Sequence, residues 1–404
     1  MEITYTQTLE VFIAHEGPKI AYGKQALGNA LFIQANELLF QQGIDTQEIN
    51  LTQWDELPMF FGTSETATIP FDLLAATFYL LSRYEEYLPH VSDDFGRFPA
   101  EASLAYKASF LDKPLINLWA FKFGTILKTT FPDLTLSNKK STTSIAIDLG
   151  VPYAFLKRGI LRTTIGYIQD VTGLKFFKIW QRTLVLLRIK KDPYDFYNTL
   201  ISIQKTHGVL NFLIRLGDPL QFQDSYNTRR KSVEVLFKKL ADYAPLGLLV
   251  SFKSLTKSAK LKSEVNRLQH TLHKPISIGI AEIHKIVLPK VYRNFLEAEI
   301  CKDFSMVYPQ NPGFRASTCT PFYWYDIDNE TKTPLQIMPV FCTSNGLITT
   351  PIKTIKDTLQ NAYVLVNKLG GTWSCVISNK SIASSKGALW LQYLKLNTWL
   401  DEPN

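Results

Sequence analysis

Apolar and polar residues follow two different patterns along the chain, and the change falls near residue 140. Before that point, short apolar runs alternate with polar turns, which predicts a small mixed layer of helices and strands. The clearest helix is the run FDLLAATFYLLSRYEEYL, where apolar residues recur at helical spacing, with Thr68 as the expected cap and Pro89 as the stop. A second helix is expected from Pro114 to about Leu127, because proline is tolerated in the first turn.

After residue 143, buried-strand patterns alternate with helical patterns. The strands are short apolar runs, as in a parallel sheet that is covered on both faces. The expected strands are 144–148, 209–214, 246–252, 276–280, 335–342 and 373–377, and the expected helices are 192–208, 227–242, 258–272, 289–299, 352–369 and 389–400. Repeated units of this length predict a parallel barrel or a doubly wound sheet, and about six or seven strands fit an incomplete barrel.

The polar stretch Ser137–Thr143, SNKKSTT, separates the two patterns and is the expected domain boundary. A chain of 404 residues is long for one domain. We therefore predict a smaller α+β domain over residues 1–140, followed by an α/β domain over residues 141–404. The second domain is expected to be such an incomplete parallel barrel or a doubly wound sheet, with any site at the carboxyl ends of its strands.

Charge is divided unevenly between these two parts. Residues 1–140 carry 10 Lys and Arg against 17 Asp and Glu, whereas residues 141–404 carry 34 against 19. The two parts therefore attract each other, and the second part favours anionic partners. Its basic residues are scattered and form no groove motif, so no specific nucleic-acid binding is expected.

The cysteines and the chain start bear on the cellular compartment. The four cysteines have no CxxC spacing and are typical of buried small residues in a reducing compartment. The first twenty residues lack the basic start and apolar centre of a signal peptide. No run approaches the roughly 18–20 apolar residues of a membrane span. We expect a cytoplasmic protein without a membrane span.

The stretch Cys301–Asp326 concentrates candidate binding residues. It runs from an apolar, strand-like piece, Phe304–Tyr308, through a Pro/Gly loop to Arg315, and ends in a cluster of aromatic residues. An arginine cannot shed its charge, so Arg315 needs an acidic partner or an anionic or sugar ligand. Aromatic walls with a few fixed polar groups are typical of saccharide clefts. A structural arginine in a packed loop is the alternative.

The expected carboxyl ends of the strands hold few metal-binding side chains. A zinc hydrolase site needs two histidines and a carboxylate. The strand ends supply Asp148 on the first strand, Glu282 and His284 after the strand near Ile280, and Ser378 on the last strand. The sequence also contains no phosphate-binding loop, nucleophile elbow or kinase motif. No metal or other cofactor is therefore predicted.

The chain resembles polysaccharide deacetylases of the NodB-homology type, in the form found in Bacteroidetes. The resemblance covers nearly the whole chain. It is carried by FDLLAATFYLLSRYEEYLP, SDDFGRF, the helix around Trp119, KDPYDFYNTLISIQKTHG, LPKVYRNFLEAEI and, most specifically, DFSMVYPQNPGFRASTCTPFYWYD. It implies an acidic N-terminal domain before a distorted (β/α) barrel. It also implies a hydrolase that removes acetyl groups from carbohydrate with a divalent metal such as zinc.

The same resemblance implies that the metal site is lost. Active members carry two aspartates in a T-x-D-x-D segment, several histidine ligands and a late histidine that acts as general acid. Here Asp148 matches the first aspartate, Gly150 stands in place of the second, and Ser378 stands in place of the late histidine. Arg315 matches the arginine that is expected to orient Asp148. We therefore hypothesise that Asp148 and Arg315 remain as a structural ion pair.

Three functions stay open at this stage. The first is a non-catalytic relative that binds a glycan, or a protein partner in polysaccharide assembly. Its stacking faces would be Tyr153, Phe314, Phe322, Tyr323 and Trp324. The second is an active carbohydrate deacetylase with a rearranged site of Asp148, Glu282 and His284. The third is a scaffold held together by the charge contrast between the domains. A bound divalent ion would distinguish the second from the first.

Overall fold

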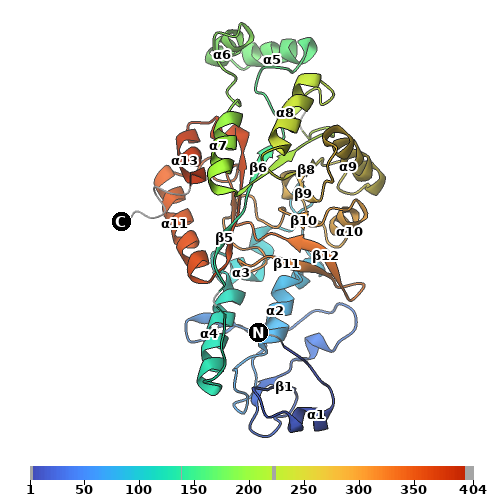
Figure 1. Ribbon diagram of the computed structural model, residues 1–404, viewed down its shortest axis with the longest axis vertical. Helices are drawn as coiled ribbons and strands as arrows, with labels where there is room; N and C mark the ends of the chain where they lie inside the picture. The colour runs from blue at the N-terminus through green and yellow to red at the C-terminus, as the bar shows by residue number, and fades with distance from the viewer. Residues whose placement is uncertain (1–2, 138, 221–223, 396–404) are drawn as a thin grey trace.

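A curled sheet of nine strands forms the centre of the second part of the chain (Figure 1). The computed structural model describes residues 3–137, 139–220 and 224–395. The strands of the sheet are β6 Ile145–Leu149, β7 Leu210–Ile214, β8 Leu246–Val250, β9 Ile278–Ala281, β10 Lys302–Asp303, β11 Phe322–Asp326, β12 Thr331–Ile337, β13 Cys342–Thr343 and β15 Cys375–Ser378.

The order of strands shows an open barrel. It runs β11-β12-β10-β9-β8-β7-β6-β15-β13, and neighbouring strands are parallel except for the antiparallel pair β11 and β12. Strands β11 and β13 form the two edges of the sheet. The structure thus has the curled, mixed α/β architecture that the sequence predicted. The sequence patterns did not reveal β10 and β13, which have two residues each, or the antiparallel β11.

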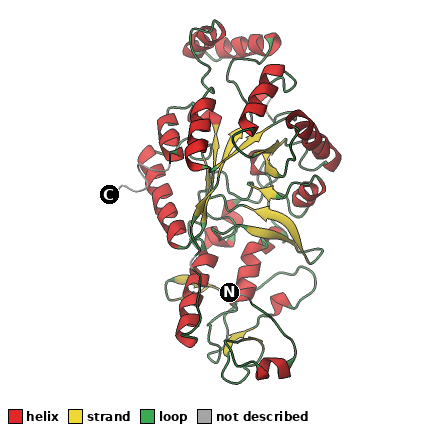
Figure 2. Ribbon diagram, in the orientation of Figure 1, coloured by secondary structure: helices red, strands yellow, loops and turns green. Residues whose placement is uncertain are grey.

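Helices cover the outer face of the sheet (Figure 2). They are α7 Tyr197–His207, α8 Lys231–Ala241, α9 Ser258–Leu272, α10 Lys290–Glu297, α11 Ile352–Lys368, α12 Asn379–Ile382 and α13 Gly387–Leu394. Helix α8 illustrates the packing, since its buried residues Val233, Leu236, Phe237 and Leu240 recur at helical spacing in the main apolar core. Burial of each such side chain stabilises the fold by about 1.5–3 kcal/mol.

A separate apolar cluster fills the inner face of the curled sheet. Its members are Ala146, Leu213, Leu249, Ile278, Ile280, Phe304, Val307, Met338, Val340 and Val376. Side chains alternate along a strand, so in β6 Ile145, Ile147 and Leu149 face the outer core while Ala146 faces inward. Asp148 follows Ala146 on the inner face and therefore marks the top of this apolar filling.

The first part of the chain builds its own core beside the barrel. Its elements are α1 Leu9–Ala14, β1 Ile20–Gly23, β2 Leu31–Gln34, η1 Glu37–Leu39, β3 Thr52–Trp54, β4 Leu57–Met59, α2 Leu73–Leu81, η2 Tyr84–Glu86, η3 Ala100–Ala102, α3 Leu104–Lys107 and α4 Leu115–Thr130. Its core centres on Phe60, Phe71 and Trp119, and it also includes Tyr308 and Ile327 from the second part. The predicted bounds of 1–140 and 141–404 stay a prediction. Asn138, within the expected boundary stretch, lies outside the described residues.

The helix expected after Thr68 is shorter than predicted. Asp72, not Thr68, caps α2, because its carboxylate accepts hydrogen bonds from the backbone N–H groups of Leu74 and Ala75. The Thr68 hydroxyl instead accepts from the backbone N–H of Phe32. The helix ends where Arg83 takes a left-handed conformation, with φ of 56°. This turn directs the arginine side chain into the molecule.

Several other boundaries also differ from the predictions. Helix α7 begins at Tyr197 and not at Asp192, because the Asp192 carboxylate accepts backbone N–H groups of Ala154, Phe155 and Leu156 and so anchors a loop. The expected strand 335–342 is divided between β12 and β13. The piece Phe304–Tyr308 is a buried loop and not a strand. Residues 396–400 of the last expected helix lie outside the described residues.

Other predictions are confirmed. Helix α9 spans the predicted residues 258–272, and α4 and α11 match theirs within three residues. Strand β5, Thr142–Thr143, pairs with β14, Thr372–Trp373, below the sheet. A helical hairpin, α5 Ile160–Thr172 and α6 Phe176–Leu186, follows β6 at one end of the molecule and was not predicted (Figure 1). No helix in the described residues is long and apolar enough to cross a bilayer.

Candidate functional site

Arg315 lies in a buried ion-pair network at the seam between the two parts of the chain. Its Nε and Nη2 atoms donate to the Glu86 carboxylate at 2.9 and 2.7 Å. Glu86 also accepts from Nε of Arg83 at 2.7 Å, and Arg83 donates to the Tyr308 hydroxyl at 2.8 Å. Burial alone would raise the pKa of Glu86, but the two arginines outweigh it and lower that pKa to about 2.

This network corrects the expected pair of Asp148 and Arg315. The charge partner of Arg315 is Glu86, from a segment 229 residues earlier in the chain. Asp148 instead lies at the end of β6 and faces the mouth of the barrel. The alternative reading, a structural arginine in a packed loop, therefore describes Arg315 correctly. Sequence spacing could not reveal the pairing, because Glu86 belongs to the first part of the chain.

The aromatic residues proposed as stacking faces do not form a common surface. Phe314 and Trp324 are each 1% exposed and belong to the core, so they cannot stack on a ligand. Tyr153 and Phe322 are partly buried against the same core. Tyr323 is exposed on the edge strand β11, where Lys332 lies 4.9 Å from its ring centre. None of the five is among the residues that line the mouth of the barrel.

A cavity of about 470 Å³ opens at the carboxyl ends of the parallel strands. We call it the mouth cavity. Its polar lining comes from Asp148 in β6, Arg215 after β7, Glu282 after β9, Thr343 in β13 and Ser378 in β15. Arg97, Asp224, His284, Gln310, Asn345, Thr349, Asn379 and Lys380 complete that polar lining. The position agrees with the general rule for parallel barrels.

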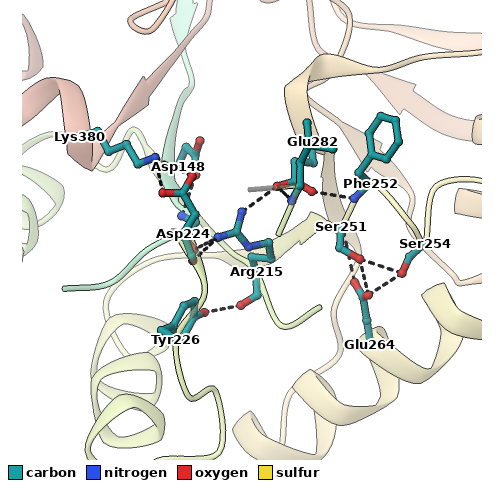
Figure 3. A network of polar contacts seen from close by, with 12 residues as sticks. Asp148, Arg215, Asp224, Tyr226, Ser251, Phe252, Ser254, Glu264, Glu282 and Lys380 are labelled. Carbon is teal, nitrogen blue, oxygen red and sulfur yellow. Dashed lines mark hydrogen bonds and ion pairs between the residues drawn. The ribbon is translucent and has the colours of Figure 1, made fainter. Parts of the chain in front are cut away.

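Arg215 and Glu282 form an ion pair across one wall of the mouth cavity (Figure 3). The distance between Arg215 Nη1 and Glu282 Oε1 is 2.8 Å. Glu282 also accepts the backbone N–H groups of Phe252 at 2.7 Å and Leu220 at 3.2 Å. Arg215 Nη2 donates to the carbonyls of Gly150 and Asp224, both at 2.8 Å. Within the described residues, Nε of Arg215 is buried and has no hydrogen-bond partner.

Asp148 brings a carboxylate to the same cavity. Its Oδ1 atom accepts the backbone N–H of Gly150 at 2.7 Å. Burial raises the pKa of Asp148, and this effect outweighs that hydrogen bond and the nearby cations Arg215 and Lys380. A Cβ atom added at Gly150 would lie 3.1 Å from Asp148 Oδ1. Gly150 itself lines the mouth cavity.

Lys380 and Asp224 separate the mouth cavity from a second cavity. The Lys380 ammonium lies 2.7 Å from both oxygens of Asp224 (Figure 3). Both residues line the mouth cavity and also a cavity of about 500 Å³ beside α5 and α6. The second cavity is mainly cationic, since Arg158, Arg162, Lys178 and Arg182 line it together with Asp170.

His284 lies in a strained turn beside the mouth cavity. Ile283 and His284 both have left-handed backbones, with φ of 54° and 56°. Such a conformation is rare for a β-branched residue and persists only where the surroundings impose it. Burial, with smaller contributions from Arg97 and Arg315, lowers the pKa of His284 to about 3, so the imidazole is neutral. Among the described residues, its buried Nδ1 atom has no hydrogen-bond partner.

The first part of the chain supplies one wall of the mouth cavity through the SDDFGRF segment. Asp93 closes this turn by accepting the backbone N–H groups of Phe95 and Arg97 at 3.0 and 2.8 Å. Arg97 Nη1 donates to the Ile283 carbonyl at 2.9 Å and so holds the strained turn. Phe95, 43% exposed, lines the cavity with Arg97. The aspartate–glycine turn was visible in the sequence, but nothing there placed it over the barrel.

Hydroxyl and amide groups close the opposite side of the mouth cavity. Ser378 donates to Asn345 Oδ1 at 2.7 Å. The backbone N–H of Ser378 donates to the Ser344 hydroxyl at 2.9 Å. Asn379 donates to the Val151 carbonyl at 2.5 Å. These groups bind each other and offer hydrogen bonds to a polar ligand, but they are poor ligands for zinc.

The residues at the mouth do not fit the zinc ion that the resemblance to deacetylases implies. In the described parts of the chain, no three His, Cys, Asp or Glu side chains are grouped as a metal site would require. The lone pairs of Glu282 are engaged by Arg215 and two backbone N–H groups. The guanidinium of Arg215 adds a positive charge where a divalent ion would need an anion. The arrangement suits binding of a polar molecule.

Comparisons with known proteins give one partial family match and distant structural similarities. Residues 1–132 match a family of unknown function, DUF7033. No curated protein matches the chain. A putative polysaccharide deacetylase from Mycobacterium smegmatis is similar at 10% identity, over 65% of this chain and 85% of that one, with a TM-score of 0.41. A CE4 family pseudoenzyme from Bacillus anthracis is similar at 10% identity, over 65% and 66%, with a TM-score of 0.30.

Proposed function

We propose that this chain is a polysaccharide-deacetylase-like protein that has lost metal-dependent deacetylation and binds a glycan at the mouth cavity. A role beside the active enzymes of polysaccharide metabolism is part of the proposal. The observation that carries it is the Arg215–Glu282 ion pair, which occupies the strand ends where a deacetylase would hold its metal. An arginine there repels a divalent cation and offers donors to the oxygen atoms of a ligand.

The size and lining of the mouth cavity support a sugar ligand. A volume of about 470 Å³ falls within the range of small-molecule sites. Asp148, Asn345 and Ser378 supply acceptors and donors that suit several hydroxyl groups at once. The partly exposed ring of Phe95 offers an apolar wall on the other side. This mixture of fixed polar groups and one aromatic face suits a saccharide ring.

A rearranged deacetylase remains the second candidate function. Asp148 and His284 both line the mouth cavity, but burial lowers the pKa of His284 to about 3, so its neutral imidazole is a weak base. Glu282, the third residue of that hypothesis, is held by three donors and is unavailable as a base or ligand. A reaction would therefore depend on Asp148 and His284 alone. The binding function does not require any of these residues to act as a base or a metal ligand.

The test is a binding experiment on the full chain with defined saccharides. The probes are β-linked N-acetylglucosamine oligomers and their deacetylated forms, studied by isothermal titration calorimetry. We expect binding, and we expect Phe95→Ala to weaken it by about tenfold. The matched control is Phe121→Ala, since Phe121 is 59% exposed on α4 and is not among the residues that line the cavity. Binding by neither set of oligomers would overturn the glycan assignment.

Metal analysis separates the two candidate functions. Protein purified without chelator is expected to hold far less than one zinc, nickel, cobalt or manganese ion per chain. It is also expected to leave acetylated oligomers intact. About one ion per chain, together with acetate release that Asp148→Asn abolishes, would establish the rearranged deacetylase. Acetate release without any metal would also contradict the proposal.

A further inference from the structure

The hairpin of α5 and α6 exposes large apolar side chains over most of its surface. Phe177 is 78% exposed, Leu174 73% and Trp180 62%. The full set of exposed apolar residues in this region is Ile160, Leu161, Ile168, Val171, Leu174, Phe176, Phe177, Trp180, Leu186, Leu187 and Ile189. Monomeric soluble proteins rarely expose so many neighbouring apolar residues, and such surfaces mark interaction sites.

Polar contacts hold this hairpin together from inside. Asp170 of α5 and Arg182 of α6 are both buried, and two nitrogens of Arg182 lie 2.6 and 3.1 Å from Asp170 Oδ2. The Arg182 guanidinium also lies 4.8 Å from the Phe155 ring centre and 5.4 Å from that of Tyr167. The hairpin therefore has a charged interior and an apolar exterior. That is the reverse of the usual arrangement in water.

The same segment carries the excess positive charge of the protein. Residues 157–191 contain nine Lys and Arg and one Asp, a net charge of +8, and the whole chain has a net charge of +8. The remaining residues are balanced, with 35 basic and 35 acidic side chains. Lys175, Lys178, Arg188, Lys190 and Lys191 are all exposed among the apolar side chains.

We propose that the hairpin docks on the surface of an anionic lipid bilayer. Aromatic and aliphatic side chains would enter the boundary between headgroups and acyl chains, and the flanking lysines would contact the phosphates. Each basic residue near such a surface adds attraction of about 1 kcal/mol. Helices α5 and α6 have 13 and 11 residues, so the hairpin lies in the interface and does not span the bilayer.

Charge argues against a second copy of the chain as the occupant of this face. In a symmetric dimer the same patch meets itself, so two segments that each carry a net charge of +8 would be in contact. A bilayer rich in anionic lipid offers the opposite charge over the whole area of the hairpin. The second cavity connects this face to the site, because Lys380 and Asp224 line both cavities. A docked hairpin would hold the barrel mouth near the membrane surface.

The experiment is co-sedimentation of the full chain with phosphatidylcholine vesicles that contain about 30% phosphatidylglycerol or none. We expect binding to the anionic vesicles that weakens as salt increases. The double variant Phe177→Ser/Trp180→Ser should bind at least about tenfold more weakly. Its matched control is Ile352→Ser/Val364→Ser, which removes two exposed apolar side chains from α11. Circular dichroism confirms that each variant is folded.

Brominated lipids test whether the hairpin itself enters the bilayer. Trp180 is the most exposed tryptophan in the described residues, so bromine on the acyl chains should quench its fluorescence. The variant Trp180→Phe should lose most of this quenching and still pellet with vesicles. Absence of binding to anionic vesicles at low salt would overturn the proposal. Micromolar self-association that Phe177→Ser/Trp180→Ser abolishes would overturn it as well, in favour of a second copy.

Discussion

Glu86 and Glu282 are two buried glutamates with arginine partners, in two different surroundings. Glu86 lies at the seam between the parts of the chain, between Arg83 and Arg315. Glu282 lies at the barrel mouth with one arginine, Arg215, and two backbone N–H donors. Glu282 and Arg215 line the mouth cavity, whereas no residue of the seam network is among the residues that line either cavity.

The difference separates a structural network from a binding one. At the seam two carboxylates, Glu85 and Glu86, neutralise two guanidinium groups inside the protein. At the mouth, an ion pair adjoins the additional carboxylate of Asp148, the cation Lys380 and the neutral His284 around an open space. Buried networks stabilise a fold when their charges are matched, and groups around a cavity are available to a ligand. The most conspicuous motif, around Arg315, therefore belongs to the structural network.

The largest expected effect is that of Glu86→Gln. Removing this charge leaves Arg83 and Arg315 buried with too little negative charge, so the free energy of unfolding should fall by about 3–5 kcal/mol. Urea denaturation measures the loss. The control is Glu297→Gln, which breaks the exposed pair with Lys262 and should change the free energy of unfolding far less. A loss at Glu86 no larger than the control would show that the seam network does not stabilise the fold.

A smaller loss is expected for Glu282→Gln, about 1–3 kcal/mol. Glu282 accepts the two backbone N–H groups on different oxygens, so a glutamine keeps an oxygen for only one of them, and water from the mouth cavity is able to reach Arg215. The same denaturation series measures this loss beside that of Glu86→Gln. Saccharide binding should also weaken, because Arg215 would lose its orienting partner. Equal losses of unfolding free energy for the two variants would contradict the distinction between the structural network at the seam and the binding network at the mouth cavity.

Sequence patterns predicted the regular part of this fold well. Strands such as β8 are fully buried apolar runs, and helices such as α9 have an unambiguous apolar stripe, so local composition determines them. The repetition of these units left an incomplete barrel and a doubly wound sheet open, and the resemblance to deacetylases favoured the barrel. Very short strands carry no such signal, and the apolar exterior of α5 and α6 has no match to the pattern of a surface helix.

The candidate site was predicted only in part. Position at a strand end identified Asp148, Glu282 and His284, and all three line the mouth cavity. Arg315 and the aromatic residues near it were selected by residue type, and burial in the core removes Phe314 and Trp324 from any binding role. Phe95, Arg97 and Arg215 depend on contacts between distant segments. Such contacts are absent from the pattern of a single sequence.

As the pH falls, the two networks should lose their contributions to stability in separate pH ranges. The pKa of His284 falls from 6.5 to about 3 in the fold, so its contribution is complete above pH 6.5 and declines towards pH 3. The pKa of Glu86 falls from 4.5 to about 2, so its contribution declines only below pH 4.5. The variant His284→Gln should therefore reduce the loss of stability between pH 6.5 and 4.5, by roughly 2 kcal/mol.

The measurement is unfolding free energy against pH for the wild type and His284→Gln. The comparison must be made as a difference, because Asp303 acts in the opposite direction. Burial raises the pKa of Asp303 to about 6, so its contribution decreases as the pH rises from 3.8 to 6. Both proteins keep Asp303, and its effect cancels in the difference. Parallel curves above pH 4.5 would show that water in the mouth cavity solvates His284 and that folding does not change its pKa.

The smallest expected effect, and the one that tests the mouth most directly, is that of Asp148→Asn. Burial raises the pKa of Asp148, so its charge opposes folding once the pH rises above 3.8. An asparagine keeps an oxygen for the N–H of Gly150 and removes the charge. Stability at pH 7 should therefore rise by about 0.5–1 kcal/mol, with no change at pH 3, while saccharide binding is lost.

The control for Asp148→Asn is Asp303→Asn. The carboxylate of Asp303 is also buried, but Ser305 and Tyr292 engage it away from the mouth cavity. Its removal should leave saccharide binding unchanged. We expect only Asp148→Asn to gain stability and also lose saccharide binding. This combination is typical of a residue that serves ligand binding and lowers the stability of the fold. If Asp148→Asn is instead destabilising at pH 7 and binds saccharide normally, Asp148 belongs with Glu86 among the structural carboxylates.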